Sequence, residues 1–310
     1  MRSSQNVIAV ALAVILLGCG RADRNLKIQI SKQANPWTNL NFYNDPDNFQ
    51  FAIVSDRTGG GQRRQGVFEN AVEKLNLLKP EFVISVGDLI QGGIEDEKKI
   101  NRQWDGFDKL VNNLDMPFFY IPGNHDISNT IMEKIWQQRL GADYYYFVYR
   151  NVLFLCLYTG DDYICGRQQA GCISEEQIEY FRKVIKANKN VRWTLVFLHH
   201  NFWQKGKGKT SESLERFEAL LSDRPYTVFA GQEHVYSKTI RNGRYHYVLA
   251  TTGGGGSGER RQLLGLDRCE FDHIVWVTMT NDGPVIANLL LDGILNDEPC
   301  PEQQPERIRE

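Results

Sequence analysis

The stretch QFAIVSDRTGGG, from Gln50 to Gly61, places four apolar residues directly before a carboxylate and a glycine turn. The run from Phe51 to Val54 predicts a short buried strand that ends just before Asp56. Glycines at the end of a strand can cradle a phosphate, whereas an aspartate there can hold a metal ion. This stretch alone leaves both interpretations open, and the residues that end the other strands decide between them.

The same arrangement returns after four further apolar runs. FVISVGD ends at Asp88, FFYIPGNHD at Asn124, His125 and Asp126, TLVFLHH at His199 and His200, and YTVFAGQEH at Gln232 and His234. A single aspartate after a strand is common in turns, but turn preferences do not explain so many endings beside glycine or histidine. Because the carboxyl ends of strands in an α/β sheet open on one crevice, we expect these side chains to converge.

The donor set points to a metal rather than to a phosphate cradle. Carboxylates, imidazoles and carboxamides bind divalent ions of Mn, Fe or Zn. The set is large enough for two ions that share one carboxylate, which is a known arrangement for in-line attack on phosphate esters. The glycines after Asp56 lack the Gly-Lys-Ser/Thr sequence of a P-loop, and we expect them to allow a tight turn beside the ions.

These motifs resemble those of the calcineurin-like metallophosphoesterase superfamily over residues 50 to 291. The motifs are Gly-Asp at 87–88, Gly-Asn-His-Asp at 123–126, a histidine after a strand at 199, and Gly-Gln-Glu-His at 231–234. The resemblance implies a metal-dependent phosphoesterase that hydrolyses a phosphate mono- or diester. The alternation of strands and helices predicts an α/β layered fold. The resemblance specifies this fold further and implies a β-sandwich of mixed sheets flanked by helices.

The resemblance also implies a role for each matching residue. Asp56 and His234 would bind the first of two divalent ions, Asn124 and His199 the second, and Asp88 would bridge them. His125 would protonate the leaving oxygen after attack by a water that the metals activate. Asp126 would orient the His125 ring.

Two positions depart from the superfamily pattern. The pattern opens with Asp-x-His and closes with Gly-His-x-His, but this chain has Thr58 and Gln232 at two of these histidines. Each ion therefore loses an imidazole, and the Gln232 carboxamide is a weak candidate ligand for the second ion. The alternative function is a degenerate metallophosphoesterase-like fold that serves as a non-catalytic binding or scaffold lipoprotein.

Other charged and imidazole side chains have competing interpretations. His200 follows His199 on a strand, where neighbours face opposite sides, so we expect only His199 to reach the site. Arg57 is expected either to bind the substrate phosphate or to form a surface salt bridge. His246 and His273 fall in late strands and are expected to be core or surface residues rather than ligands.

The N-terminus predicts a signal peptide over residues 1–18. Its apolar run, Val7 to Leu17, is too short for a comfortable membrane span. The following LLGC, ending at Cys19, resembles a bacterial lipoprotein signal, which implies that Cys19 is lipidated and anchors the protein to a membrane. An ordinary secretory signal with an incidental cysteine and an uncleaved anchor are the alternatives. Each of them places the folded domain outside the cytoplasm.

After the signal, the chain is predicted to contain a tether (19–48), one metallophosphoesterase domain (49–295) and a disordered, proline-rich tail (296–310). A net charge of −2 over 310 residues, without a basic stripe, gives no electrostatic footprint for nucleic acid. Within the domain, apolar spacing and a capping box predict helices over 67–78, 174–187 and 211–221. Antiparallel strands with a turn at 281–284 are predicted near the end.

Disulfides are permitted in the predicted compartment. Without Cys19, five cysteines remain of the six, so at least one thiol stays unpaired. Cys165 and Cys172 are close enough in sequence for a small loop disulfide.

Overall fold

The computed structural model describes residues 38–39, 42–58, 64–160, 171–203, 212–255, 269–291 and 293–296. Its contacts divide the chain into two units, Met1–Pro46 and Asp47–Glu310, and every described helix and strand belongs to the second. The predicted signal peptide, Cys19 and the tail beyond residue 296 lie outside the described residues, so these predictions remain predictions.

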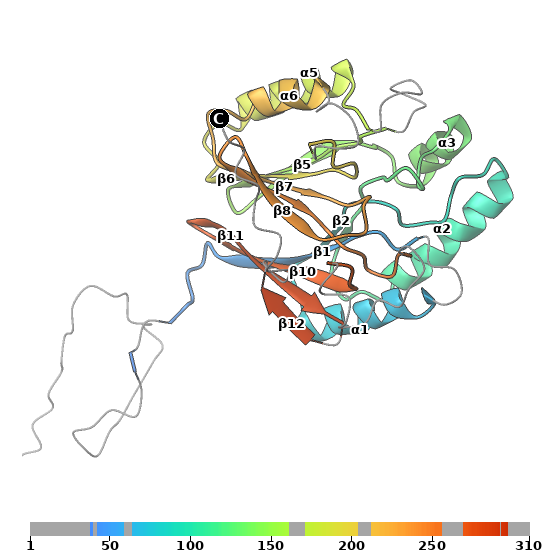
Figure 1. Cartoon of the computed structure of the whole chain (residues 1–310), viewed down its shortest axis with the longest axis horizontal. Helices are drawn as coiled ribbons and strands as arrows, with labels where there is room; N and C mark the ends of the chain where they lie inside the picture. The colour runs from blue at the N-terminus through green and yellow to red at the C-terminus, as the bar shows by residue number, and fades with distance from the viewer. Residues whose placement is uncertain are drawn as a thin grey trace, which may run out of the picture. The chain divides into compact units, whose positions relative to one another are not determined.

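The first sheet combines parallel and antiparallel strands in the order β12-β11-β10-β1-β2-β3 (Figure 1). Its parallel half holds β1 (Phe49–Val54), β2 (Val83–Ser85) and β3 (Phe118–Phe119). Its antiparallel half holds β10 (His273–Thr280), β11 (Gly283–Leu290) and β12 (Gly293–Asn296). The turn between β10 and β11 falls where Asn281 and the residues after it predicted one.

The second sheet is also mixed, in the order β4-β5-β6-β7-β9-β8. Its centre is the parallel set β5 (Val152–Cys156), β6 (Trp193–Phe197), β7 (Tyr226–Ala230) and β9 (Arg244–Val248). The edges, β4 (Tyr145–Tyr149) and β8 (Ser237–Arg241), pair in the antiparallel sense. In both sheets, parallel strands carry their carboxyl ends to a common edge.

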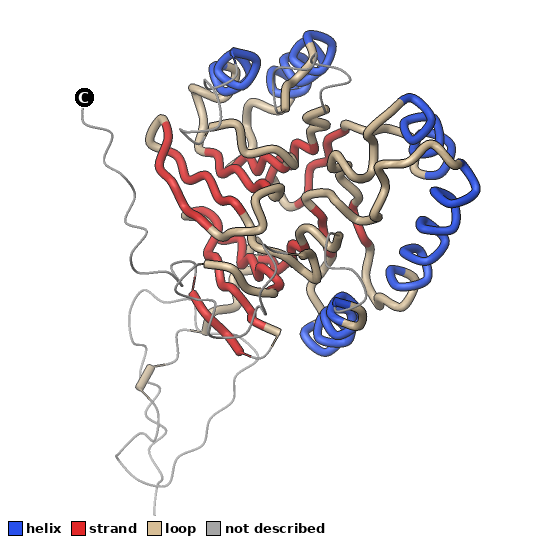
Figure 2. Tube along the Cα trace, turned by 45° about the vertical axis from the view of Figure 1, so that its right-hand side comes forward, coloured by secondary structure: helices blue, strands red, loops and turns tan. Residues whose placement is uncertain are grey.

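Helices cover the outer faces of the two sheets (Figure 2). Those on the first sheet are α1 (Val67–Leu78), α2 (Glu97–Val111) and α3 (Thr130–Arg139), and those on the second are α5 (Glu175–Ala187) and α6 (Glu212–Ala219). The result is a sandwich of two mixed sheets flanked by helices, as the sequence predicted. In the part of the chain that the structure describes, no helix has both the length and the apolar character needed to span a membrane.

Aromatic side chains fill the space between the sheets. Phe51 of the first sheet lies 5.1 Å from Phe82 and 5.5 Å from Phe154 of the second sheet, measured between ring centroids. Phe154 in turn stacks on Phe197, at 6.0 Å. Aromatic rings bury a large apolar area and prefer such offset or edge-on arrangements. This core fixes the distance between the sheets, and hence between the strand ends that carry the polar residues.

Two helices, α2 and α3, were not predicted from the sequence. Ile100, Trp104 and Phe107 form the buried stripe of α2, but charged residues surround them in sequence and obscure the period. Side-chain caps define where both helices begin. Asp96 Oδ1 accepts from Lys99 N at 3.0 Å, and Asn129 Oδ1 accepts from the first turn of α3. The predicted cap of α5 is confirmed, since Ser174 Oγ accepts from Gln177 N at 3.2 Å.

The cysteines follow the expectation in part. Cys156 is free and buried in β5, which confirms that at least one thiol stays unpaired. Cys172 and Cys269 are disulfide-bonded. Cys165 lies outside the described residues, so the loop disulfide between Cys165 and Cys172 stays a prediction.

Candidate functional site

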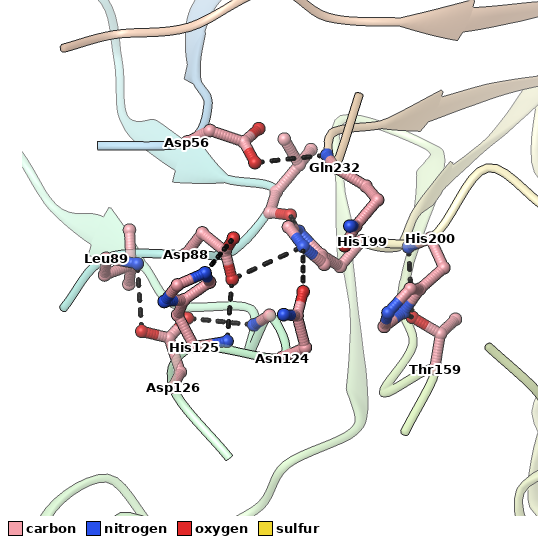
Figure 3. Close-up of polar contacts among 12 residues, drawn as sticks. Asp56, Asp88, Leu89, Asn124, His125, Asp126, Thr159, His199, His200 and Gln232 are labelled. Carbon is pink, nitrogen blue, oxygen red and sulfur yellow. Dashed lines mark hydrogen bonds and ion pairs between the residues drawn. The ribbon is translucent and has the colours of Figure 1, made fainter. Parts of the chain in front are cut away.

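The strand ends of both sheets deliver the predicted polar side chains to one place (Figure 3). Asp56 follows β1, Asp88 follows β2, and Asn124 and His125 follow β3. From the second sheet, His199 follows β6, and Gln232 and His234 follow β7. Suitable ligand atoms of Asp56, Asp88 and His199 all lie within 4.8 Å of one another, and all three residues are buried. The convergence expected from the sequence is therefore present.

The glycines of two motifs make room for a carboxylate. A Cβ atom on Gly123 would lie 2.2 Å from Asp88 Oδ1, and one on Gly231 would lie 2.4 Å from Asp56 Oδ2. Asp88, Gln232 and His234 themselves have left-handed backbones, with φ of 60°, 75° and 58°. Such conformations cost about 1–3 kcal/mol each for residues other than glycine, and they gather at functional sites.

Asp88 lies at the centre of the site. Its Oδ1 accepts from His125 N at 2.9 Å and lies 3.3 Å from His199 Nε2, while its Oδ2 lies 3.9 Å from His125 Nε2. Burial alone would raise the pKa of this carboxyl, but the two histidines outweigh burial and lower the pKa to about 2. Asp88 is therefore ionised at neutral pH in a place that water scarcely reaches.

The contacts of His199 show that the site fits a cation. Its Nδ1 donates to the Val86 carbonyl at 2.8 Å. Its Nε2 then faces two acceptor atoms, Asn124 Oδ1 at 3.0 Å and Asp88 Oδ1 at 3.3 Å. A neutral imidazole offers a lone pair at this nitrogen, so three lone pairs converge unless a cation or a proton stands among them. Burial disfavours the charged ring, but Asp88 and Asp56 overcome it and raise the pKa of His199 to about 10.

Asp56 and His234 form a second polar pair beside this group. Asp56 is fully buried, and its Oδ1 lies 3.2 Å from His234 Nε2 and accepts from Gln232 N at 3.1 Å. Ser55 Oγ donates to Asp56 Oδ2, and the Gly255 carbonyl accepts from His234 Nδ1. With its Nδ1 committed in this way, His234 presents Nε2 to the carboxylate, which is the orientation that a metal ligand needs.

The two positions that depart from the superfamily pattern each carry a buried side-chain oxygen. Gln232 Oε1 and Thr58 Oγ1 have no hydrogen-bond partner among the residues that the structure describes. A buried polar atom without a partner costs about 1–3 kcal/mol. An oxygen ligand to a divalent cation would remove this cost, so the Gln232 side chain fits the predicted role of a weak ligand.

His125 is the exposed member of the group, with 34% of its side-chain surface accessible to solvent. Its Nδ1 lies 2.6 Å from the Gln91 carbonyl oxygen, which can only accept, so Nδ1 carries a proton and Nε2 faces Asp88. The expectation that Asp126 orients this ring is wrong. Asp126 is fully buried and accepts from the backbone N–H groups of Leu89, Ile90 and Gly123 at 2.9, 3.1 and 2.8 Å.

Neighbouring histidines divide as predicted. The His200 ring turns to Thr159, whose Oγ1 lies 2.9 Å from His200 Nδ1, and stands edge-on to the His199 ring. Burial, together with His199, lowers the pKa of His200 to about 3, so this ring stays neutral. His246 and His273 are buried, and they pair with Glu218 and Asn288 away from the site.

Arg57 packs between the first sheet and its helices. Its guanidinium lies over the rings of Phe68 and Phe107, at 5.9 and 5.6 Å from their centroids, and donates to the Leu89 carbonyl at 3.0 Å. Among the described residues it forms these contacts rather than a surface salt bridge. The contact with a substrate phosphate stays a prediction.

The contacts that sequence reasoning missed are made largely by the main chain. The Val86 carbonyl orients His199 and the Gln91 carbonyl orients His125. A sequence motif of side chains does not indicate where a main-chain carbonyl will point. The available signals were the glycines that follow Val86 and Gln91, Gly87 and Gly92, which have φ of +101° and +51°.

A profile of the family described as calcineurin-like phosphoesterase matches residues 49–236. A probable glycerophosphodiester phosphodiesterase of Arcobacter nitrofigilis is 26% identical over 194 residues, which is 56% of this chain and 64% of that protein. A 3′,5′-cyclic adenosine monophosphate phosphodiesterase of Haemophilus influenzae is 27% identical over 46% of this chain and 48% of its own. The match thus spans less than two thirds of either relative.

Two solved structures share the fold at low identity. A dimetal phosphatase of Danio rerio superimposes with a TM-score of 0.57 and 14% identity, over 80% of this chain and 98% of that one. GAP50, described as the anchor in the inner membrane complex of Plasmodium, superimposes with a TM-score of 0.56 and 13% identity, over 80% of this chain and 89% of its own. At such identities the likeness concerns the fold alone.

We expect Asp88→Asn to lower the bound metal more than substitution of any other candidate ligand. The amide would remove both a central ligand atom and the negative charge that two histidines now stabilise. Metal content after dialysis, measured by mass spectrometry, gives the comparison, with the exposed Asp115→Asn as the matched control. Wild-type metal content in Asp88→Asn would contradict the central position of this carboxylate.

Proposed function

This chain belongs to the calcineurin-like phosphoesterase family, and on that premise we propose that it hydrolyses a phosphate mono- or diester at the site around Asp88. The proposal depends mainly on one observation, the meeting of His199 Nε2, Asn124 Oδ1 and Asp88 Oδ1 beside a partly exposed His125. Convergent lone pairs suit a divalent ion, and an imidazole at their edge suits proton transfer. Both curated relatives are named as phosphodiesterases, which favours a diester.

We further propose that the site holds two divalent ions of Mn, Fe or Zn. Asp56 and His234 would hold one, Asn124 and His199 the other, and Asp88 would be shared, with Gln232 as a weak ligand of the second. The pairing of Asp56 with His234 and of Asn124 with His199 supports this division. Such ions, when bound, polarise phosphoryl oxygens and lower the pKa of water.

His125 is the proposed general acid. With its Nδ1 proton held by the Gln91 carbonyl, the proton that can move sits on Nε2. That atom faces the site from a ring accessible to solvent, so it can reach an ester oxygen of a bound substrate. Transfer of the Nε2 proton to this oxygen as the bond to phosphorus breaks would neutralise the departing alkoxide.

The experiment that tests this function is an ester panel. Purified protein is loaded with Mn²⁺, Fe²⁺ or Zn²⁺ and assayed on phosphomonoesters and phosphodiesters. We expect turnover of at least one ester class, abolished by a chelator and restored by added metal. Absence of turnover in a protein that has bound its metals would contradict the proposal.

The alternative function, a non-catalytic binding or scaffold protein, is favoured by Thr58 and Gln232. Each stands where the superfamily pattern has an imidazole, and a hydroxyl or carboxamide binds late first-row ions less tightly than imidazole does. Metal content distinguishes the two functions. Purified protein that takes up no Mn²⁺, Fe²⁺ or Zn²⁺ would favour the scaffold.

We also propose that the protein is a lipoprotein anchored through Cys19 to a bacterial membrane, with its folded domain in the periplasm or at the cell surface. The support is the sequence alone, since an apolar run ends in Leu-Leu-Gly-Cys at residues 16–19. The anchor would leave the phosphoesterase domain facing substrates outside the cytoplasm.

His125→Ala is expected to reduce turnover while leaving metal content unchanged. The ring donates a proton but holds no ion, and a general acid contributes about 10²–10⁴-fold to a rate. Turnover at saturating substrate and metal content are measured on the same sample. An unchanged rate would remove His125 from the mechanism.

Gln232→His should tighten metal binding at the second ion and raise activity when metal is limiting. It would rebuild the Gly-His-x-His pair, and histidine tolerates the left-handed backbone of this position better than most residues do. The wild-type carboxamide should lean toward Mn²⁺ over Zn²⁺. Parallel titrations of metal into both proteins give the comparison. Superimposable curves would mean that residue 232 does not reach an ion.

Cys19→Ser is expected to abolish lipid labelling and to release the protein from the membrane fraction. The serine hydroxyl cannot form the thioether on which this lipidation depends. Labelling with a fatty-acid probe and fractionation of cells give the result. Labelling that continues in the variant would contradict the lipoprotein proposal.

A further inference from the structure

One peptide group joins the proposed acid to helix α2. The carbonyl of Gln91 accepts from His125 Nδ1 at 2.6 Å, and the next N–H along the chain, that of Gly92, donates to Gln103 Oε1 at 2.8 Å. These two atoms belong to the same peptide bond. Gln103 lies within α2 and is half-buried.

The geometry of a peptide bond makes the two contacts interdependent. A trans peptide is planar, and its C=O and N–H point in opposite directions. When Gln103 fixes the N–H of Gly92, it therefore aims the C=O of Gln91 at the His125 ring. A hydrogen bond on one side of a peptide also polarises the bond on the other side.

The Gln91–Gly92 peptide comes directly after two residues whose N–H groups a buried carboxylate holds. Asp126 fixes the preceding N–H groups of Leu89 and Ile90, but its oxygens do not reach the Gln91–Gly92 peptide. Gly92 has a φ of +51°, and a Cβ atom there would lie 1.5 Å from the His125 carbonyl oxygen. Glycine is thus required for the loop to approach His125, and its backbone freedom would let the peptide rotate once Gln103 is removed.

We propose that Gln103 is a positioning residue for the acid. Through the Gln91–Gly92 peptide it keeps the Nδ1 proton of His125 in place and Nε2 turned to the substrate. The proposal rests on the proposed function of His125. Gln103 itself touches neither His125 nor the candidate metal ligands in the contacts that the structure describes.

This role predicts a dependence on the leaving group. An ester with a para-nitrophenolate leaving group needs little protonation, whereas an alkyl ester of the same acid depends on the general acid. Loss of the orientation of the His125 ring should slow hydrolysis of the alkyl ester more than hydrolysis of the activated ester. A general disturbance of the fold or of metal binding would slow both esters by the same factor.

The test compares Gln103→Met with wild type on this matched ester pair. Methionine keeps the length of the side chain but offers no oxygen to Gly92. We expect kcat for the alkyl ester to fall about 10-fold, a part of the roughly 10²–10⁴-fold that a general acid contributes. We expect kcat for the activated ester, KM for both esters and metal content to stay near wild type.

Two further variants complete the comparison. Gln103→Glu keeps an acceptor for Gly92 N–H and should retain the wild-type ratio of the two rates. Gln138→Met makes the same exchange at an exposed position of α3 and should also retain it. An equal loss on both esters in Gln103→Met, or no loss on either, would overturn the proposal.

A measurement that does not depend on catalytic turnover tests the role of Gln103 independently of the proposed function. In isotope-labelled protein, the Nδ1 proton of His125 should give a slowly exchanging magnetic resonance signal, assigned by its loss in His125→Ala. We expect the signal in wild type and Gln103→Glu, and its loss in Gln103→Met. If wild type hydrolyses no ester, this signal still decides the positioning role, and its persistence in Gln103→Met would overturn that role.

Discussion

Asp88 carries a negative charge at a position that is only 2% exposed, and the surrounding structure is arranged to stabilise that charge. A buried carboxylate is costly unless cations or hydrogen-bond donors surround it. Here Oδ1 accepts a backbone N–H and faces the His199 imidazole of the second sheet, while Oδ2 faces the His125 imidazole. The left-handed backbone at Asp88 and the absence of a side chain at Gly123 are what allow the carboxylate to sit there.

The need to surround the buried Asp88 carboxylate with polar groups explains why the site is built from two sheets. Asp56, Asp88 and Asn124 come from the first sheet, whereas His199, Gln232 and His234 come from the second. The bond from His199 Nδ1 to the Val86 carbonyl joins the sheets at the site itself. The aromatic core between them sets the spacing, so the ligand atoms meet without a flexible loop having to close on them. His125, the proposed acid, is held differently, by a peptide of the 89–92 loop whose N–H donates to Gln103 of helix α2.

The sequence predicted the layered fold and the residues that converge, because both depend on short-range patterns. Apolar runs predict strands, and the polar residues at the carboxyl ends of parallel strands come together at one edge of the sheet. The prediction for Asp126 was wrong because its partners, three backbone N–H groups, come close to it only in the folded chain. The two phenylalanine rings against which Arg57 packs could not be identified from the sequence for the same reason. The orientation of His125 escaped prediction because its partner is a carbonyl.

We infer that this cluster is a metal centre organised by the Asp88 carboxylate. Crystals of the protein grown with Mn²⁺, with data collected on both sides of the manganese absorption edge, test it most directly. We expect two anomalous peaks, each within ligand distance of an Asp88 oxygen, one beside Asp56 and His234 and the other beside Asn124 and His199. A map with no peak at Asp88, in crystals whose protein still shows His199 against Asn124, would contradict it.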